Sequence, residues 1–153
     1  MKVDHIQKEY EKYGFLNFES VNKEFELTGL ELDKWDFLNS FCRLVEGKLG
    51  KFVSYTTALI MPGGNYHAIV QGGVKDKLVL EEAHLLYRDL MIHYHESLKA
   101  QLASEKEQVV FLKAFLKKYP LLKERVLVLL DACQQVFVEQ GLDKKKESRG
   151  YLG

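Results

Sequence analysis

The residues from Leu78 to Ala103 constrain the fold most, because this long stretch contains neither proline nor glycine. Those two residue types are the ones that most often interrupt an α-helix, so the stretch predicts one long central helix. It also carries three histidines and four carboxylates, the densest group of chemically active side chains in the sequence. The same helix therefore sets both the expected fold and the expected candidate sites.

The central helix is predicted to present one apolar stripe to a core. At about 100° per residue, six residues fall on that stripe: Val79, Ala83, Leu86, Leu90, Tyr94 and Leu98. Such a stripe is typical of a helix that packs against others in a bundle. Polar and charged residues lie along both of its edges.

Capping signals predict where other helices begin and end. Thr28 followed by Glu31 is a capping box, in which the two side chains satisfy free backbone amides. It predicts a helix from about residue 29 to 46, ended by Gly47 or Gly50.

A second capping box, Ser104 followed by Glu107, comes directly after the central helix. It either opens a new helix over residues 105–118 or marks a bend in a continuous one. Pro120 suits the first turn of a last helix, where its missing amide costs nothing, and Gly141 would end that helix.

Residues 52–71 have the composition of a β-hairpin. Residues 52–61 are rich in β-branched and aromatic side chains, residues 66–71 are again strand-like, and Pro-Gly-Gly-Asn at 62–65 is a strong turn signal. Two short helices broken at this proline are the alternative, since a serine and an asparagine stand where each helix would begin.

The predicted fold class is therefore mainly α, or α+β where the hairpin forms, as a compact bundle of four to five helices. A length of 153 residues and a hydrophobic fraction of 46% suit one folded domain, expected over residues 1–142. Residues 143–153 contain three consecutive lysines and no apolar stripe, which predicts a mobile, solvated tail.

Charge and cysteine content narrow the function classes. Basic and acidic residues number 22 each, whereas a dedicated nucleic-acid binder usually has a basic excess, so nucleic acid is not the expected partner. Cys42 and Cys133 belong to no paired motif and lie among apolar neighbours, which predicts free, buried thiols. No apolar run reaches the ~20 residues that span a bilayer. With no leader recognised at Met1, a cytoplasmic location is expected, and export by a leaderless route stays open.

One edge of the central helix carries a candidate metal or acid–base site. Asp89, His93 and Glu96 are four and three residues apart, which places them on neighbouring turns. An imidazole between carboxylates suits zinc, iron or manganese, so this interpretation implies a divalent transition metal as cofactor. The simpler interpretation needs no cofactor: an acidic, solvated flank in which the histidine pairs with its neighbours.

Beyond the other edge, His84, Arg88 and His95 form a mildly cationic set. Such a set could receive a phosphate or a carboxylate group, which makes it a candidate anion-binding site. The simpler interpretation is exposed helix surface, or ion pairs with the carboxylates of a neighbouring helix.

Leu85 and Ile92 are apolar residues on the otherwise polar back of the same helix. Because they are seven residues apart, they fall on one line. Either another element covers this line, or it is an exposed interaction face for a partner. The zero net charge removes one barrier to self-association.

These features predict a small, non-catalytic helical protein–protein interaction module of the adaptor, regulatory-subunit, inhibitor or chaperone type. The sequence has no GxSxG, HExxH, EF-hand or paired CxxC motif that would indicate a known enzyme or metal site. The expected partner is another protein or a second copy of the chain. The alternative is a metal- or small-ligand-binding domain, including an enzyme, that uses His93 with Asp89 and Glu96.

Overall fold

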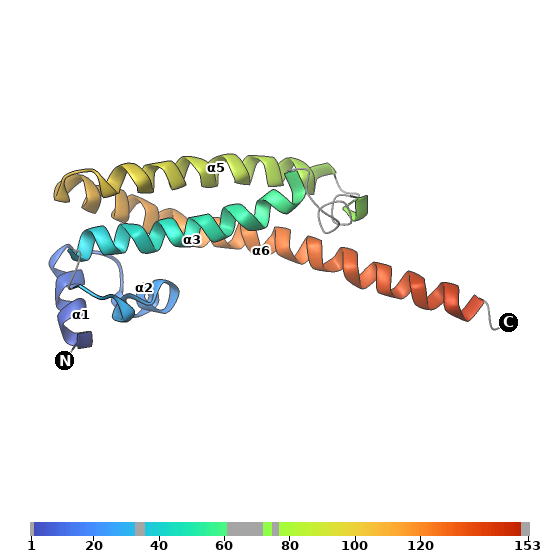
Figure 1. The fold of residues 1–153 in the computed structure, drawn as a ribbon, viewed down its shortest axis with the longest axis horizontal. Helices are drawn as coiled ribbons and strands as arrows, with labels where there is room; N and C mark the ends of the chain where they lie inside the picture. The colour runs from blue at the N-terminus through green and yellow to red at the C-terminus, as the bar shows by residue number, and fades with distance from the viewer. Residues whose placement is uncertain (1, 33–35, 61–71, 75–76, 151–153) are drawn as a thin grey trace. The chain divides into compact units, whose positions relative to one another are not determined.

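The chain is mainly α-helical in its computed structural model (Figure 1). The structure describes residues 2–32, 36–60, 72–74 and 77–150, and it contains no β-strand in these ranges. The elements in chain order are helix α1 (Lys2–Lys12), helix α2 (Phe18–Phe25), the 3-10 turn η1 (Leu27–Gly29), and helices α3 (Phe37–Ile60), α5 (Lys77–Gln101) and α6 (Glu105–Gly150). The prediction of a mainly helical fold is confirmed.

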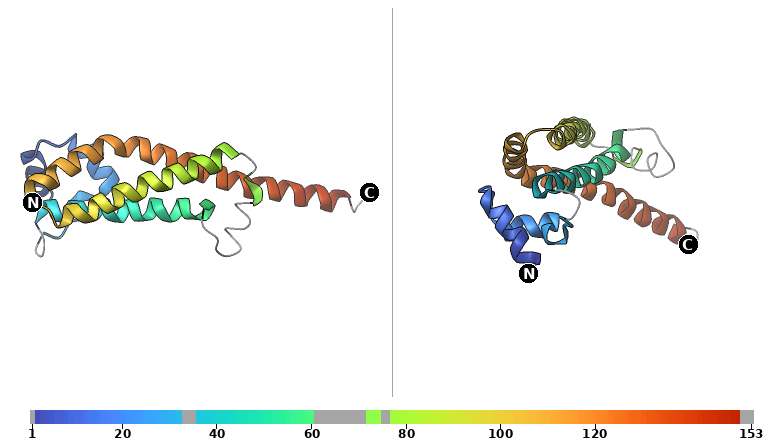
Figure 2. Two further views of the ribbon diagram at one scale, coloured as in Figure 1. Left: turned by 90° about the horizontal axis from the view of Figure 1, so that it is seen from above. Right: turned by 60° about the vertical axis from the view of Figure 1, so that its left-hand side comes forward.

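The chain divides into two compact units, and each of the three long helices contributes residues to both. Unit 1 comprises Met1–Lys51 and Leu90–Pro120, and unit 2 comprises Phe52–Asp89 and Leu121–Gly153. In unit 1 the first part of α3, the last part of α5 and the first part of α6 run side by side (Figure 1 and the left panel of Figure 2). That the chain behaves as a single domain over residues 1–142 stays a prediction.

The core of unit 1 is built from aromatic rings around Tyr10. The Tyr10 ring centroid lies 5.1 Å from that of Phe15 and 5.3 Å from that of Phe18, and its hydroxyl donates to the Leu16 carbonyl at 2.5 Å. Helices as short as α1 and α2 are marginal in isolation, so their stability depends on this packing. The Phe41 ring, 6.2 Å from Tyr10, joins the cluster from α3.

The helix predicted to start at about residue 29 starts later, at Phe37. Its cap is Asp36, whose Oδ1 accepts the Asn39 amide at 2.7 Å. Thr28 cannot open a helix, because it lies in η1 and its own amide donates to Asn22 Oδ1 at 3.0 Å. The contact with the Asn22 side chain thus replaces the predicted capping box. The predicted C-terminal boundary near Gly47 is wrong as well, because α3 continues to Ile60.

The β-hairpin prediction over 52–71 is wrong in its first half, and its second half lies outside the described residues. Residues 52–60 continue α3 without a break at Gly50. Buried side chains recur at helical spacing through this region: Val45, Leu49, Phe52, Thr56 and Leu59. The Thr56 and Thr57 hydroxyls donate to carbonyls three residues earlier, at 2.9 and 2.8 Å. Burial at helical spacing therefore overrides the β-propensity of these residues.

The capping box at Ser104 is confirmed and separates α5 from α6. The Glu107 amide donates to Ser104 Oγ at 3.3 Å, and the Ser104 amide donates to Glu107 Oε2 at 3.0 Å. Carbonyls in the last turn of α5 also accept hydrogen bonds from side chains. Gln108 Nε2 donates to the Ala100 carbonyl at 3.0 Å, and Asn39 Nδ2 donates to the Gln101 carbonyl at 3.2 Å.

Helix α6 neither begins near Pro120 nor ends at Gly141, so both predicted boundaries are wrong. A proline inside a helix costs about 3 kcal/mol, because it removes a hydrogen bond and crowds the preceding turn. Burial on both sides of Pro120 offsets this cost, since the helix buries residues in each flanking turn: Leu112, Phe115, Leu116, Tyr119, Leu122, Val126 and Leu129. Residues 143–150 are helical, and the mobility of the tail stays a prediction.

The predicted core stripe of α5 is correct for its first half only. Ala83, Leu86 and Leu90 are fully buried, but Leu98 is exposed. Ser97 takes its place in the core, with its hydroxyl donating to the Tyr94 carbonyl at 2.6 Å.

In unit 2, Gly73 lies so close to Val136 that an added Cβ would come within 2.2 Å of its Cγ1 atom.

Replacing Ser104 with alanine should destabilise the protein by about 1 kcal/mol, because the Glu107 amide then loses its capping acceptor. Urea unfolding followed by circular dichroism measures this difference. Glu81→Ala, at an exposed position of α5, is the control and should change stability by less than about 0.5 kcal/mol. Equal losses in the two variants would contradict the role of the cap.

Candidate functional site

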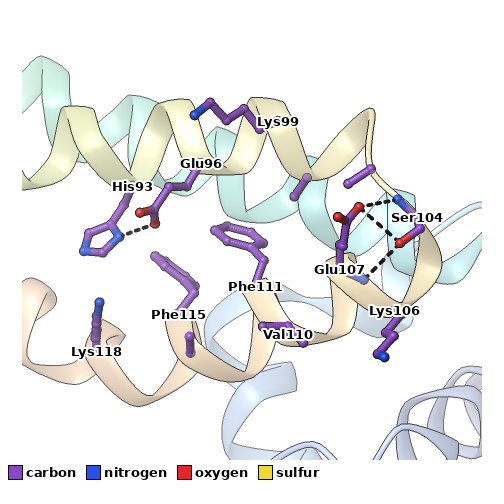
Figure 3. Close-up of a pocket in the computed structure, with 13 residues that line it drawn as sticks. His93, Glu96, Lys99, Ser104, Lys106, Glu107, Val110, Phe111, Phe115 and Lys118 are labelled. Atoms are coloured by element: carbon purple, nitrogen blue, oxygen red, sulfur yellow. Dashed lines mark hydrogen bonds and ion pairs between the residues drawn. The ribbon is translucent and has the colours of Figure 1, made fainter.

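Unit 1 contains a groove of about 730 Å³ between the end of α5 and the start of α6 (Figure 3). We call it the α5/α6 groove. Its lining combines apolar and charged residues: His93, Glu96, Lys99, Ala100, Ala103, Ser104, Lys106, Glu107, Val110, Phe111, Ala114, Phe115 and Lys118. All of them belong to unit 1.

The floor of the α5/α6 groove is apolar and recessed. Phe111 and Phe115 project from α6 toward α5, and their rings stack with centroids 6.0 Å apart (Figure 3). Phe115 is only 2% exposed, whereas Val110 at the edge is 63% exposed. The groove therefore offers a fixed aromatic floor that is open to solvent along one side.

The charged side chains of the groove divide into paired acids and unpaired lysines. His93 Nδ1 donates to Glu96 Oε2 at 3.0 Å, and Glu107 is held in the capping box with Ser104. The lysines at 99, 106 and 118 make no ion pair or hydrogen bond within the described part of the chain. The charged groups of the rim that are available to contact a ligand are therefore the positive ones.

In unit 2, Arg125 binds two of the carboxylates that the sequence placed on one edge of α5. Its Nε donates to Glu82 Oε1 at 2.6 Å, and its Nη1 donates to Asp89 Oδ2 at 2.9 Å. Burial alone would raise the pKa of Asp89, but the hydrogen bonds and charges of Arg125 and Arg88 outweigh it and hold that pKa below its ordinary value. This carboxylate is a structural partner of α6.

The predicted metal set is not assembled as a ligand shell. In unit 2, Asp89 forms an ion pair with Arg125. In unit 1, His93 forms a hydrogen bond with Glu96. Over residues 2–32, 36–60, 72–74 and 77–150, no three His, Cys, Asp or Glu side chains are grouped so that they could hold a metal ion. The prediction of a divalent transition metal therefore gains no support from the geometry.

The predicted anion set is not joined by contacts either. His84 and Arg88 are exposed on α5 in unit 2, and Arg88 lies 3.4 Å from Asp89 Oδ1. His95, in unit 1, donates from Nδ1 to the Met91 carbonyl at 2.8 Å. Each of the three side chains has its own surroundings, so anion binding by the set stays a prediction.

The predicted interaction residues are exposed. Leu85 is 45% exposed and Ile92 is 50% exposed. The structure adds Leu78, which is 72% exposed and lies seven residues before Leu85. We call these three residues the exposed apolar residues of α5. Helix α6 likewise exposes large apolar side chains in unit 2: Leu121, Leu127, Val128, Phe137 and Val138.

Both cysteines are free and buried, as predicted. Burial, with a smaller effect of the Asp36 charge, raises the pKa of the Cys42 thiol to about 12. Burial also raises the pKa of Cys133. Neither thiol is placed to act as a nucleophile, because each is held protonated and away from solvent.

Neither the α5/α6 groove nor the Arg125 contacts are predicted from the sequence. One available signal was Val110 and Phe111, which lie off the apolar side of their helix and yet are large and apolar. Another was the Ser104 capping box, because a short connection between two helices makes them antiparallel neighbours. No comparable signal marks Arg125, because its partners are far away in sequence.

Comparison of the chain with protein-family models, with curated proteins and with solved structures finds no match. Within the described ranges, no helix has the length and apolar character needed to cross a membrane. The function is therefore inferred from the surfaces of each unit.

Asp89→Asn should lower stability by about 1 kcal/mol at pH 7, since it weakens a partly buried pair with Arg125. The depressed pKa of Asp89 means that its stabilising effect is present above the unfolded value, about 3.9, and is lost as the pH falls through the folded value. The difference in unfolding free energy between the wild type and D89N should therefore shrink from pH 6 to pH 2.

Asp131→Asn is the matched control, because Asp131 is exposed on α6 and has no ion pair in the described structure. Urea unfolding at each pH measures both variants. A difference for D89N that stays constant as the pH falls would contradict the ion-pair assignment.

The native protein should react slowly with a thiol reagent such as DTNB, because Cys42 and Cys133 are buried. Both thiols should react within the mixing time after unfolding in guanidinium chloride. Absorbance at the wavelength of the released thiolate follows the reaction. Rapid release of one equivalent from the native protein would contradict the burial of that cysteine.

Proposed function

We propose that this chain is a non-catalytic helical module that associates with other protein chains, and that the exposed apolar residues of α5 mediate its association with a second copy of itself. The observation that carries this proposal is the exposure of Leu85 and Ile92, at 45% and 50%. Single exposed leucines are ordinary on protein surfaces. Repetition at seven-residue spacing is the pattern with which helices pair along a seam.

The energetics of burial support association. A large aliphatic side chain gains about 1.5–3 kcal/mol when it is fully buried rather than exposed. Much of this stabilisation is missing in the single chain, because three such side chains are exposed: Leu78, Leu85 and Ile92. The formal net charge of zero adds no long-range repulsion between two copies.

Burying these residues against another chain should therefore make the molecular mass depend on concentration. Light scattering after size-exclusion chromatography should give a mass above the 17.7 kDa of the monomer that rises with loading. The double variant Leu85→Ser, Ile92→Ser should stay monomeric over the same range. Circular dichroism at a concentration where the wild type is monomeric should show the same helical content, because both side chains are exposed.

Glu81→Ser, Arg88→Ser is the matched control, because it changes two exposed polar residues of the same helix, also seven apart. It should associate as the wild type does. A wild-type mass that stays at the monomer value at the highest concentration reached, together with no partner captured from the lysate of its host, would overturn the proposal.

A further inference from the structure

We propose that the α5/α6 groove of unit 1 binds an amphipathic helix of a partner protein, and that acidic residues flank the apolar stripe of that helix. The inference rests on the proposed function, because it assigns a partner to an interaction module. It concerns a different surface from the exposed apolar residues of α5, and a different kind of ligand from a second copy of the chain.

The shape of the groove favours a helix. A groove between two packed helices is a recurrent site for a third helix, which lays its apolar stripe on the floor. Here Phe111 and Phe115 form that floor, and Val110 provides an apolar edge that is 63% exposed (Figure 3). Exposed aromatic and aliphatic groups beside a buried aromatic ring are typical anchoring sites in protein interfaces.

The recessed floor argues against a lipid surface as the ligand. Proteins that bind a bilayer through apolar residues insert an apolar face into its interfacial region. In the groove, Phe115 is 2% exposed and lies between the two helices. A convex ligand such as a helix about 10 Å across can enter the groove beside Val110 and Phe111, whereas a flat surface would rest on its edges.

The charges specify the ligand further. The two glutamates of the groove already have partners, because Glu96 accepts from His93 and Glu107 caps α6. The three lysines have none in the described residues, and they stand on both sides: Lys99 on α5, and Lys106 and Lys118 on α6. A helix with aspartate or glutamate on both flanks of its apolar stripe would complement this rim.

The positions of the lysines also set the length of the ligand. Lys106 and Lys118 are twelve residues apart on α6, which corresponds to about 18 Å at 1.5 Å per residue. A partner helix of about three to four turns would span this distance. Its apolar residues would recur at three- and four-residue spacing, so that they meet Val110, Phe111 and Ala114 in turn.

The test uses the full chain and a set of fluorescent 18-residue helical peptides. Each peptide carries one apolar stripe of Leu, Ile, Phe or Met, flanked either by glutamates or, in its matched counterpart, by lysines. Fluorescence anisotropy should show that at least one glutamate peptide binds about tenfold or more tightly than its lysine counterpart. This preference should weaken as the salt concentration rises, since salt screens exposed charges.

Variants locate the binding. Val110→Glu places a charge on the exposed edge of the groove and should weaken the best glutamate peptide about tenfold. Lys106→Glu, Lys118→Glu should reverse the preference between glutamate and lysine peptides. Leu127→Glu is the matched control, because Leu127 is exposed on α6 in unit 2, and it should leave peptide binding unchanged. Circular dichroism checks that each variant is folded.

The inference is overturned by any of three results: no peptide binds, glutamate and lysine peptides bind equally, or V110E and L127E weaken binding equally. Binding to vesicles of anionic phospholipid without binding to any peptide would also overturn it and would identify a lipid surface as the ligand. None of these results affects the concentration dependence of the mass. Failure of this inference is therefore distinguishable from failure of the proposed function.

Discussion

The turn between α5 and α6 is the contact on which unit 1 depends. Ser104 and Glu107 cap the start of α6, and the Gln108 side chain donates to the Ala100 carbonyl at the end of α5. A helix end that is buried without such partners would cost several kilocalories per mole. Because both ends are satisfied within a few residues, the two helices can pack side by side, and the α5/α6 groove lies between them.

Most of the fold follows from helical spacing, and the errors have a common cause. The helix at 78–103 and the capping box at Ser104 are local features, and both are found in the structure. The boundaries predicted at residues 29, 120 and 141 also depend on local signals, and these are wrong. At Pro120 the local signal is weaker than the burial of apolar residues on both sides of it. The Thr-rich segment of α3 shows the same competition, since Thr56 is buried in a helix despite its β-propensity.

The candidate sites were predictable only in part. The exposure of Leu85 and Ile92 follows from their place on a polar helix face. Helical periodicity in the sequence is enough to identify that face. The ion pair of Asp89 cannot be predicted in this way, because its partner Arg125 is thirty-six residues away in sequence. Carboxylates and histidines on one helix look alike in sequence whether they bind a metal or a neighbouring arginine. Only the position of the second helix decides between these roles, and periodicity carries no information about it.

Gln108 has a consequence for how freely the α5–α6 pair can move. Its side chain is 5% exposed, and its amide nitrogen has the Ala100 carbonyl as partner at 3.0 Å. Sliding one helix past the other by a single turn would separate that buried amide from the Ala100 carbonyl, at a cost of about 1–3 kcal/mol. The pair is therefore held in one register. A ligand that binds between these helices therefore finds a preformed site and loses little affinity to rearrangement of the protein.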